Sequence, residues 1–152
     1  MRYMRGLLLV LMLGALAACQ PANKNSPFPH ISLNNFGPTT VKAGNVSDTV
    51  FLAFDFTDGD GDLNSSTFVK LIDSRDSSVR NYPFATIDPS LIDPDRGLEG
   101  ICYVKIQAAG LVIRTDSVHF EKGDTLSYTT YITDAAGNES NRLNTPQLII
   151  RP

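Results

Sequence analysis

The chain has 152 residues, with 13 Lys and Arg against 16 Asp and Glu, and a net charge of −3 at pH 7. This length supports one domain whose core is large enough to fold without disulfide or metal staples. Phosphate backbones repel an acidic chain, which argues against nucleic-acid binding.

The N-terminus carries the pattern of an export signal. Arg2 and Arg5 flank an apolar run that extends from Gly6 to Leu16. The run is shorter than the roughly 20 residues that a helix needs to cross a bilayer, so we interpret residues 1–18 as a cleaved signal peptide. Cleavage would remove both arginines and leave the remaining chain more acidic.

A cysteine stands directly after this run, in the sequence Leu16-Ala17-Ala18-Cys19. The motif resembles the lipobox of bacterial lipoproteins, and the resemblance implies cleavage before Cys19, lipid on its sulfur and an acyl chain such as palmitate on its new amine. Two or more acyl chains hold a protein stably at a membrane. Gln20 stands where an Asp would resemble an inner-membrane retention signal, so we expect anchoring in the outer membrane, on its periplasmic or its surface side.

The lipidated cysteine and the next ten residues, 19–29, are expected to form a flexible tether. They are polar, hold three prolines and include one large apolar side chain, Phe28. At about 3.3 Å per extended residue, the tether would hold the domain about 30 Å from the lipid. Since Cys19 is committed to lipid, Cys102 has no partner for an intramolecular disulfide, and we expect it to be a buried strand residue.

Residues 30–152 show short strands separated by turns. Val50, Leu52, Phe54 and Phe56 recur with the period of a half-buried strand, and Asp88–Arg96 with its two prolines is expected to be a loop. The pattern predicts an all-β protein with one antiparallel Ig-like β-sandwich of about seven strands. The predicted strands are Thr49–Thr57, Thr67–Asp73, Gly100–Gln107, Leu111–Arg114, Ser117–Glu121, Leu126–Thr133 and Gln147–Arg151.

Two segments of this region resemble known envelope domains. The run DTVFLAFDFTDGDGDL at 48–63 is similar to the opening half of small, mostly uncharacterised Gram-negative lipoproteins. The run YITDAAGNESN at 131–141 resembles the last hairpin of bacterial Ig-like domains. The resemblance implies one Ig-like sandwich in the cell envelope, without an assigned activity.

The segment Asp58-Gly59-Asp60-Gly61-Asp62 is the candidate functional site in this sequence, because it places three carboxylates within five residues. Continuing the preceding strand would bury three carboxylates on one face, so the chain must turn here, and glycine permits the turn. Close carboxylate pairs near a surface repel by about 4 kcal/mol before relaxation, and Ca²⁺ relieves that repulsion. The loop departs from an EF-hand, which requires Gly in place of Leu63 and a bidentate Glu in place of Val69.

Any cation at this loop therefore needs ligands from elsewhere in the fold. If strands 49–57 and 126–133 end on the same side of the sandwich, the loops that follow them meet there. The alternative is a solvated Asp-Gly turn without an ion. The predicted cofactor is calcium, and its candidate ligands are Asp58, Asp60, Asp62, Asp134 and Asn138.

The remaining residues give no sign of catalysis. The sequence has no GxSxG, HExxH, CxxC or P-loop pattern, and His30 and His119 lack neighbours at zinc-ligand spacing. We expect a non-catalytic envelope lipoprotein that acts as a structural or binding module, with a membrane, an envelope protein or a glycan as partner. One alternative is a small hydrolase that uses the Asp-rich loop. The other is a carbohydrate-binding accessory lipoprotein that uses exposed aromatic rings among Phe51, Tyr82, Tyr103 and Tyr131.

Overall fold

The computed structural model describes residues 26–114 and 117–152. The predicted signal peptide, the lipidation site Cys19 and most of the predicted tether lie outside these residues. Within them, no helix has the length and apolar character needed to cross a membrane.

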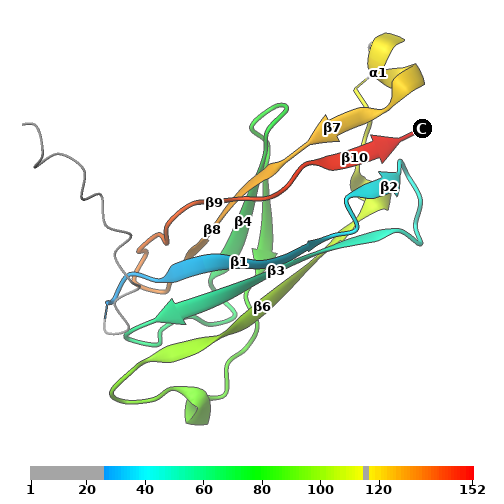
Figure 1. Ribbon diagram of the computed structural model, residues 1–152. Coiled ribbons are helices and arrows are strands. Elements are labelled where there is room, and N and C mark those ends of the chain that lie inside the picture. The colour runs from blue at the N-terminus through cyan, green and yellow to red at the C-terminus, as the bar shows by residue number, and fades with distance from the viewer. Residues whose placement is uncertain (1–25, 115–116) are drawn as a thin grey trace, which may run out of the picture.

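Ten strands form the framework of the described chain (Figure 1). Their bounds are β1 His30–Gly37, β2 Thr40–Lys42, β3 Thr49–Asp58, β4 Phe68–Asp73, β5 Val79–Pro83, β6 Leu98–Gln107, β7 Asp124–Leu126, β8 Tyr128–Thr133, β9 Leu143–Asn144 and β10 Leu148–Arg151. Three short helical segments complete the list: η1 Pro89–Leu91, η2 Ala108–Gly110 and α1 Ser117–Lys122. The strands form three hydrogen-bonded sheets with the orders β1-β3-β6, β5-β4-β8-β9 and β2-β10-β7.

The strand order is that of an Ig-like sandwich. In such a sandwich the strands A, B and E share one sheet, while C, F and G share the other. Here β1-β3-β6 has the A-B-E order, and β4-β8-β9 has the C-F-G order with β5 added beside β4. The predicted all-β, Ig-like fold class is therefore confirmed.

Apolar side chains from all three sheets form one core. The predicted alternation on β3 holds, because Val50, Leu52, Phe54 and Phe56 are all buried. Phe56 meets Phe84 edge-on, with 5.2 Å between the ring centroids. Each fully buried large side chain stabilises the fold by about 1.5–3 kcal/mol, so this core holds the sheets together.

Several details of the strand prediction are wrong. The predicted strand Leu126–Thr133 is interrupted at Ser127, because β7 pairs with β10 in one sheet while β8 pairs with β4 in another. Leu111–Arg114 follows η2 without joining a sheet, and Ser117–Glu121 lies in helix α1. Short apolar runs fit a helix or a strand equally well. β2 and β10 are parallel, so the sandwich is not wholly antiparallel.

Candidate metal centre

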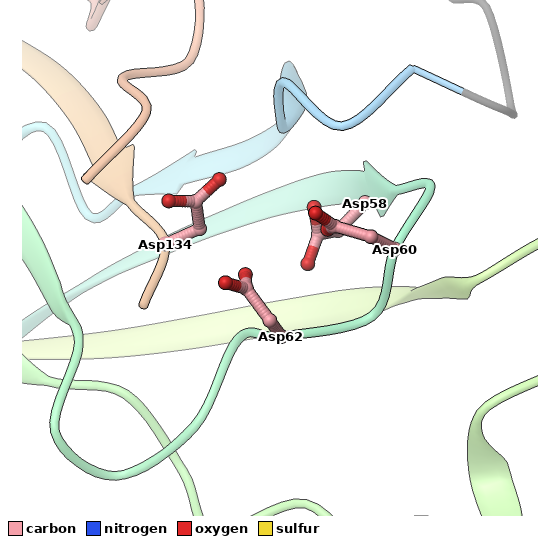
Figure 2. A group of neighbouring side chains, drawn as sticks. All are labelled: Asp58, Asp60, Asp62 and Asp134. Atoms are coloured by element: carbon pink, nitrogen blue, oxygen red, sulfur yellow. The ribbon is translucent and has the colours of Figure 1, made fainter. Parts of the chain in front are cut away.

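Two loops from different sheets bring four carboxylates together at one end of the sandwich. Asp58 is the last residue of β3, and Asp134 directly follows β8. One carboxylate oxygen from each of Asp58, Asp60, Asp62 and Asp134 lies within 4.8 Å of the others. Figure 2 shows the four groups gathered around one shared space. The predicted meeting of the loops is therefore present, while binding of calcium there stays a prediction.

Asp58 is the most deeply buried member of this acidic cluster, with 1% of its surface exposed. Its Oδ2 accepts a hydrogen bond from the Leu63 backbone N–H at 3.2 Å, whereas its Oδ1 is buried without a hydrogen-bond partner. Burial raises the pKa of Asp58 to about 7, with a smaller contribution from the neighbouring carboxylates. A buried carboxylate oxygen without a partner is costly, and a cation would remove that cost.

Asp62 connects the two loops. Its Oδ2 accepts a hydrogen bond from the Ala136 backbone N–H at 2.8 Å, and its Oδ1 is a second buried oxygen without a partner. Burial, followed by the charges of Asp134 and Asp60, raises the pKa of Asp62. Both carboxyl groups that carry an unpartnered oxygen would therefore be easier to ionise next to a cation.

Asn138 approaches the cluster through its amide nitrogen. Its Nδ2 donates to Asp134 Oδ2 at 2.9 Å and to the Pro27 carbonyl at 3.2 Å, and its backbone N–H donates to Asp134 Oδ1 at 2.7 Å. Both acceptors lie on the donor side of the amide, which fixes its orientation. In this geometry Asn138 positions Asp134, and its predicted role as a direct ligand stays a prediction.

Glycine is required where the acidic loop turns and where a second loop packs on it. Gly61 has a φ of 69° and Gly97 a φ of 74°, a region that favours glycine. A Cβ on Gly97 would collide with the Asp58 carbonyl oxygen, and a Cβ on Gly61 would collide with the Ile92 side chain. The segment 92–97 therefore supports the acidic loop from outside.

The cluster suits Ca²⁺ in size and charge. Calcium binds six to eight oxygens at 2.3–2.6 Å, so two ligands on opposite sides of the ion lie about 4.6–5.2 Å apart. The four carboxylate oxygens lie within that span of one another. The ion pairs found among the described residues join other side chains and leave these four carboxylates without a basic partner. Backbone carbonyls or waters would complete the coordination.

The sequence did not reveal that the predicted tether enters the domain beside this cluster. The Ser26 carbonyl accepts a hydrogen bond from the Gly59 backbone N–H at 2.9 Å. The Pro27 carbonyl accepts the bond from Asn138 described above. The last residues of the predicted tether thus contact both loops that carry the carboxylates.

A second charged cluster, also missed from the sequence, pairs acids with arginines. Asp124 is buried and bonded to Arg75 at 2.9 Å and to Arg114 at 2.8 Å, and Arg75 also binds Asp73 at 2.8 Å. Burial alone would raise the pKa of Asp124, but the two guanidinium groups hold it well below its usual range. This cluster is charge-compensated, which is typical of structural ion pairs.

The cysteine, aromatic and histidine residues considered in the sequence analysis lie on several different elements. Cys102 is half-buried on β6, and burial raises the pKa of its thiol to about 11, so it stays protonated at neutral pH. Tyr131 is buried under the cations of Lys70 and Arg142. Tyr103 is 66% exposed. His30 is the first residue of β1 and His119 lies in α1, so the two histidines belong to different elements.

Comparisons with known proteins yield one structural likeness. No family model matches the sequence, and the comparison with curated proteins gives no match. Among solved structures, the chain is similar to the PKD domain of an M14-like peptidase from Thermoplasmatales archaeon SCGC AB-540-F20. The identity is 16%, the match covers 84% of this chain and 99% of that chain, and the TM-score is 0.38.

Proposed function

We propose that the protein is a non-catalytic, lipid-anchored module of the Gram-negative cell envelope whose Ig-like domain is made rigid by calcium. The observation that carries the calcium part is the pair of buried, unpartnered carboxylate oxygens on Asp58 and Asp62. These oxygens lie in a cluster whose carboxylates come from loops that follow strands of two different sheets. An ion bound there would link the loop after β3 to the loop after β8.

The geometry of the cluster favours a structural metal over hydrolysis. A general acid must reach the substrate atom that it protonates. Asp58, whose raised pKa of about 7 would suit that role, is nearly inaccessible to solvent. The same burial favours a carboxylate that coordinates an internal ion.

The proposed lipid anchor rests on the lipobox-like sequence that ends at Cys19. Ser26, which belongs to the predicted tether, contacts Gly59 in the acidic loop, so the tether would join the domain beside the acidic cluster. A calcium ion would stiffen the end of the domain that faces the membrane and so limit its pivoting on the tether. The proposed role of the metal is therefore mechanical.

Thermal unfolding tests the calcium part. With calcium at about 100 times its Kd, we expect a stabilisation of about 2.7 kcal/mol, or about 10 °C for a domain of this size, relative to EDTA. Asp62→Asn should abolish the difference. Asp95→Asn, an equal charge change at an exposed residue, should preserve it. Equal melting temperatures of the unmodified protein in calcium and EDTA would contradict the proposal.

Mass spectrometry of the protein from bacterial membranes tests the anchor. We expect the mature chain to begin at Cys19 with a lipid thioether and an acylated amine. Cys19→Ser should lose the lipid and the membrane association. An unmodified Cys19 sulfur in the purified protein would contradict this part and leave the calcium part standing.

A further inference from the structure

Strand β6 forms an open edge of its sheet. Among the described residues it pairs only with β3, along all ten of its residues (Figure 1). The opposite edge, β1, is covered at Ile31, where the Asn141 side chain accepts from the backbone N–H at 2.8 Å and donates to the carbonyl at 2.9 Å. Long open edges with apolar side chains are templates for pairing with another strand.

An apolar groove runs along this edge. It has a volume of about 730 Å³ and lies between β6 and the end of β5, with Phe84 and Leu91 in its wall. On β6 itself, Ile101 is 47% exposed and Tyr103 is 66% exposed. The edge therefore has no neighbouring strand among the described residues on this side and also exposes apolar surface.

The sequence of β6 is self-complementary. It reads LEGICYVKIQ, and the pairs at equal distance on either side of Cys102 include the apolar residues Ile101 and Tyr103 and the charged residues Glu99 and Lys105. Glu99 and Lys105 have opposite charges, and both are exposed. In antiparallel pairing about an axis at Cys102, each Glu99 would lie opposite Lys105 of the other copy.

We propose that this edge pairs with β6 of a second copy of the chain, antiparallel and about a two-fold axis at Cys102. Such an interface is isologous, so every favourable contact occurs twice. Ile101 would lie opposite Tyr103 of the second copy on the outer face. Gly100 would lie opposite Val104 on the inner face, and the two Cys102 side chains would be neighbours.

The charges of Glu99 and Lys105 favour this antiparallel register and favour a second copy of the chain as the partner. A parallel arrangement would place Glu99 against Glu99, and an antiparallel shift by two residues would place Lys105 against Ile101 or Gly97. Like charges directly opposite each other destabilise strand pairing, and opposite charges stabilise it. A second copy carries the matching charges at both ends of the apolar run, since it has the same sequence.

Charge-reversal variants test the pairing. The full chain is produced in a Gram-negative host as two co-expressed forms with different C-terminal tags, and detergent extracts are purified through one tag. The unmodified chain should recover its other form. Lys105→Glu in both forms should reduce this recovery about tenfold or more, because two opposite-charge pairs become like-charge pairs. Lys42→Glu, the same charge change on strand β2, should leave it unchanged.

A pair of variants with complementary charges separates a loss of pairing from a folding defect. Glu99→Lys in one form and Lys105→Glu in the other should restore recovery, because both charge pairs are again opposite. The double variant Glu99→Lys/Lys105→Glu should also pair with itself. Absence of recovery for the unmodified chain, or failure of the mixed variants to restore it, would overturn the proposal.

A thiol crosslinker locates the axis. In the same extracts at raised pH, which ionises more of the Cys102 thiol, a short bismaleimide should join two chains at Cys102 and give a product of twice the monomer mass. Cys102→Ala should remove this product, which also excludes a crosslink through Cys19. Absence of the product from unmodified chains that co-purify would overturn the placement of the axis. The co-purification result depends on neither calcium nor lipid at Cys19.

Discussion

Asp62 and Ala136 form the hydrogen bond that joins the acidic loop to the loop after β8, with 2.8 Å between the Asp62 Oδ2 and the Ala136 nitrogen. These loops follow strands of opposite sheets, so the bond ties the two layers together at one end. Repulsion among four carboxylates acts against this tie. The net stability of this end of the domain should therefore depend on the charge state of the cluster.

Asp58→Asn should change stability in opposite directions with and without calcium. In EDTA the neutral amide removes repulsion and a buried charge, and its carbonyl can still accept the bond from Leu63, so we expect stabilisation by about 1–2 kcal/mol. In calcium the variant loses a ligand and should melt below the unmodified protein. Chemical denaturation under both conditions measures the two differences, and a shift of the same sign in both would argue against a metal at Asp58.

The pH dependence of the metal-free protein should show the raised pKa of Asp58. The folded pKa of about 7 lies above the unfolded value near 4, so its protonation favours the folded state. The contribution is fully present below about pH 4 and is lost as the pH rises to about 7, which amounts to a few kcal/mol. Urea titrations in EDTA at pH 5 and pH 8 should therefore show higher stability at pH 5. Asp58→Asn should reduce that difference.

The fold was largely predictable because strand alternation is a local signal. Val50 to Phe56 show the buried face directly in the sequence, and the loops after β3 and β8 could be matched once the strands were ordered. The contacts of Ser26 with Gly59 were not predictable, because they join a polar segment without periodicity to a distant turn. The helix over Ser117–Lys122 was missed because its short apolar pattern also fits a strand.

The salt bridges of Arg75 should matter more for stability than the surface pair of Arg142 with Glu139. The Arg75 side chain is 10% exposed and binds two buried carboxylates, so Arg75→Ala leaves Asp73 and Asp124 with less compensation. We expect a loss of about 3 kcal/mol or more. Arg142→Ala removes an exposed pair at 3.2 Å together with a contact to Tyr131 and should cost about 1 kcal/mol or less. Urea denaturation of the two variants compares these costs, and equal costs would contradict the structural role of the buried network.

Gly97→Ala tests whether the segment 92–97 supports the acidic loop. Gly97 and Gly44 have similar φ values of 74° and 68°, so alanine strains the backbone about equally at both positions. At Gly97 the new Cβ also collides with the backbone of Asp58 and Gly59, whereas at Gly44 it meets nothing within 4 Å. We expect Gly44→Ala to cost about 1 kcal/mol and to leave the calcium-dependent shift in melting temperature intact. Gly97→Ala should cost more and should also diminish that shift, because the collision displaces Asp58. If both variants retain the full shift, the segment 92–97 does not position the cluster.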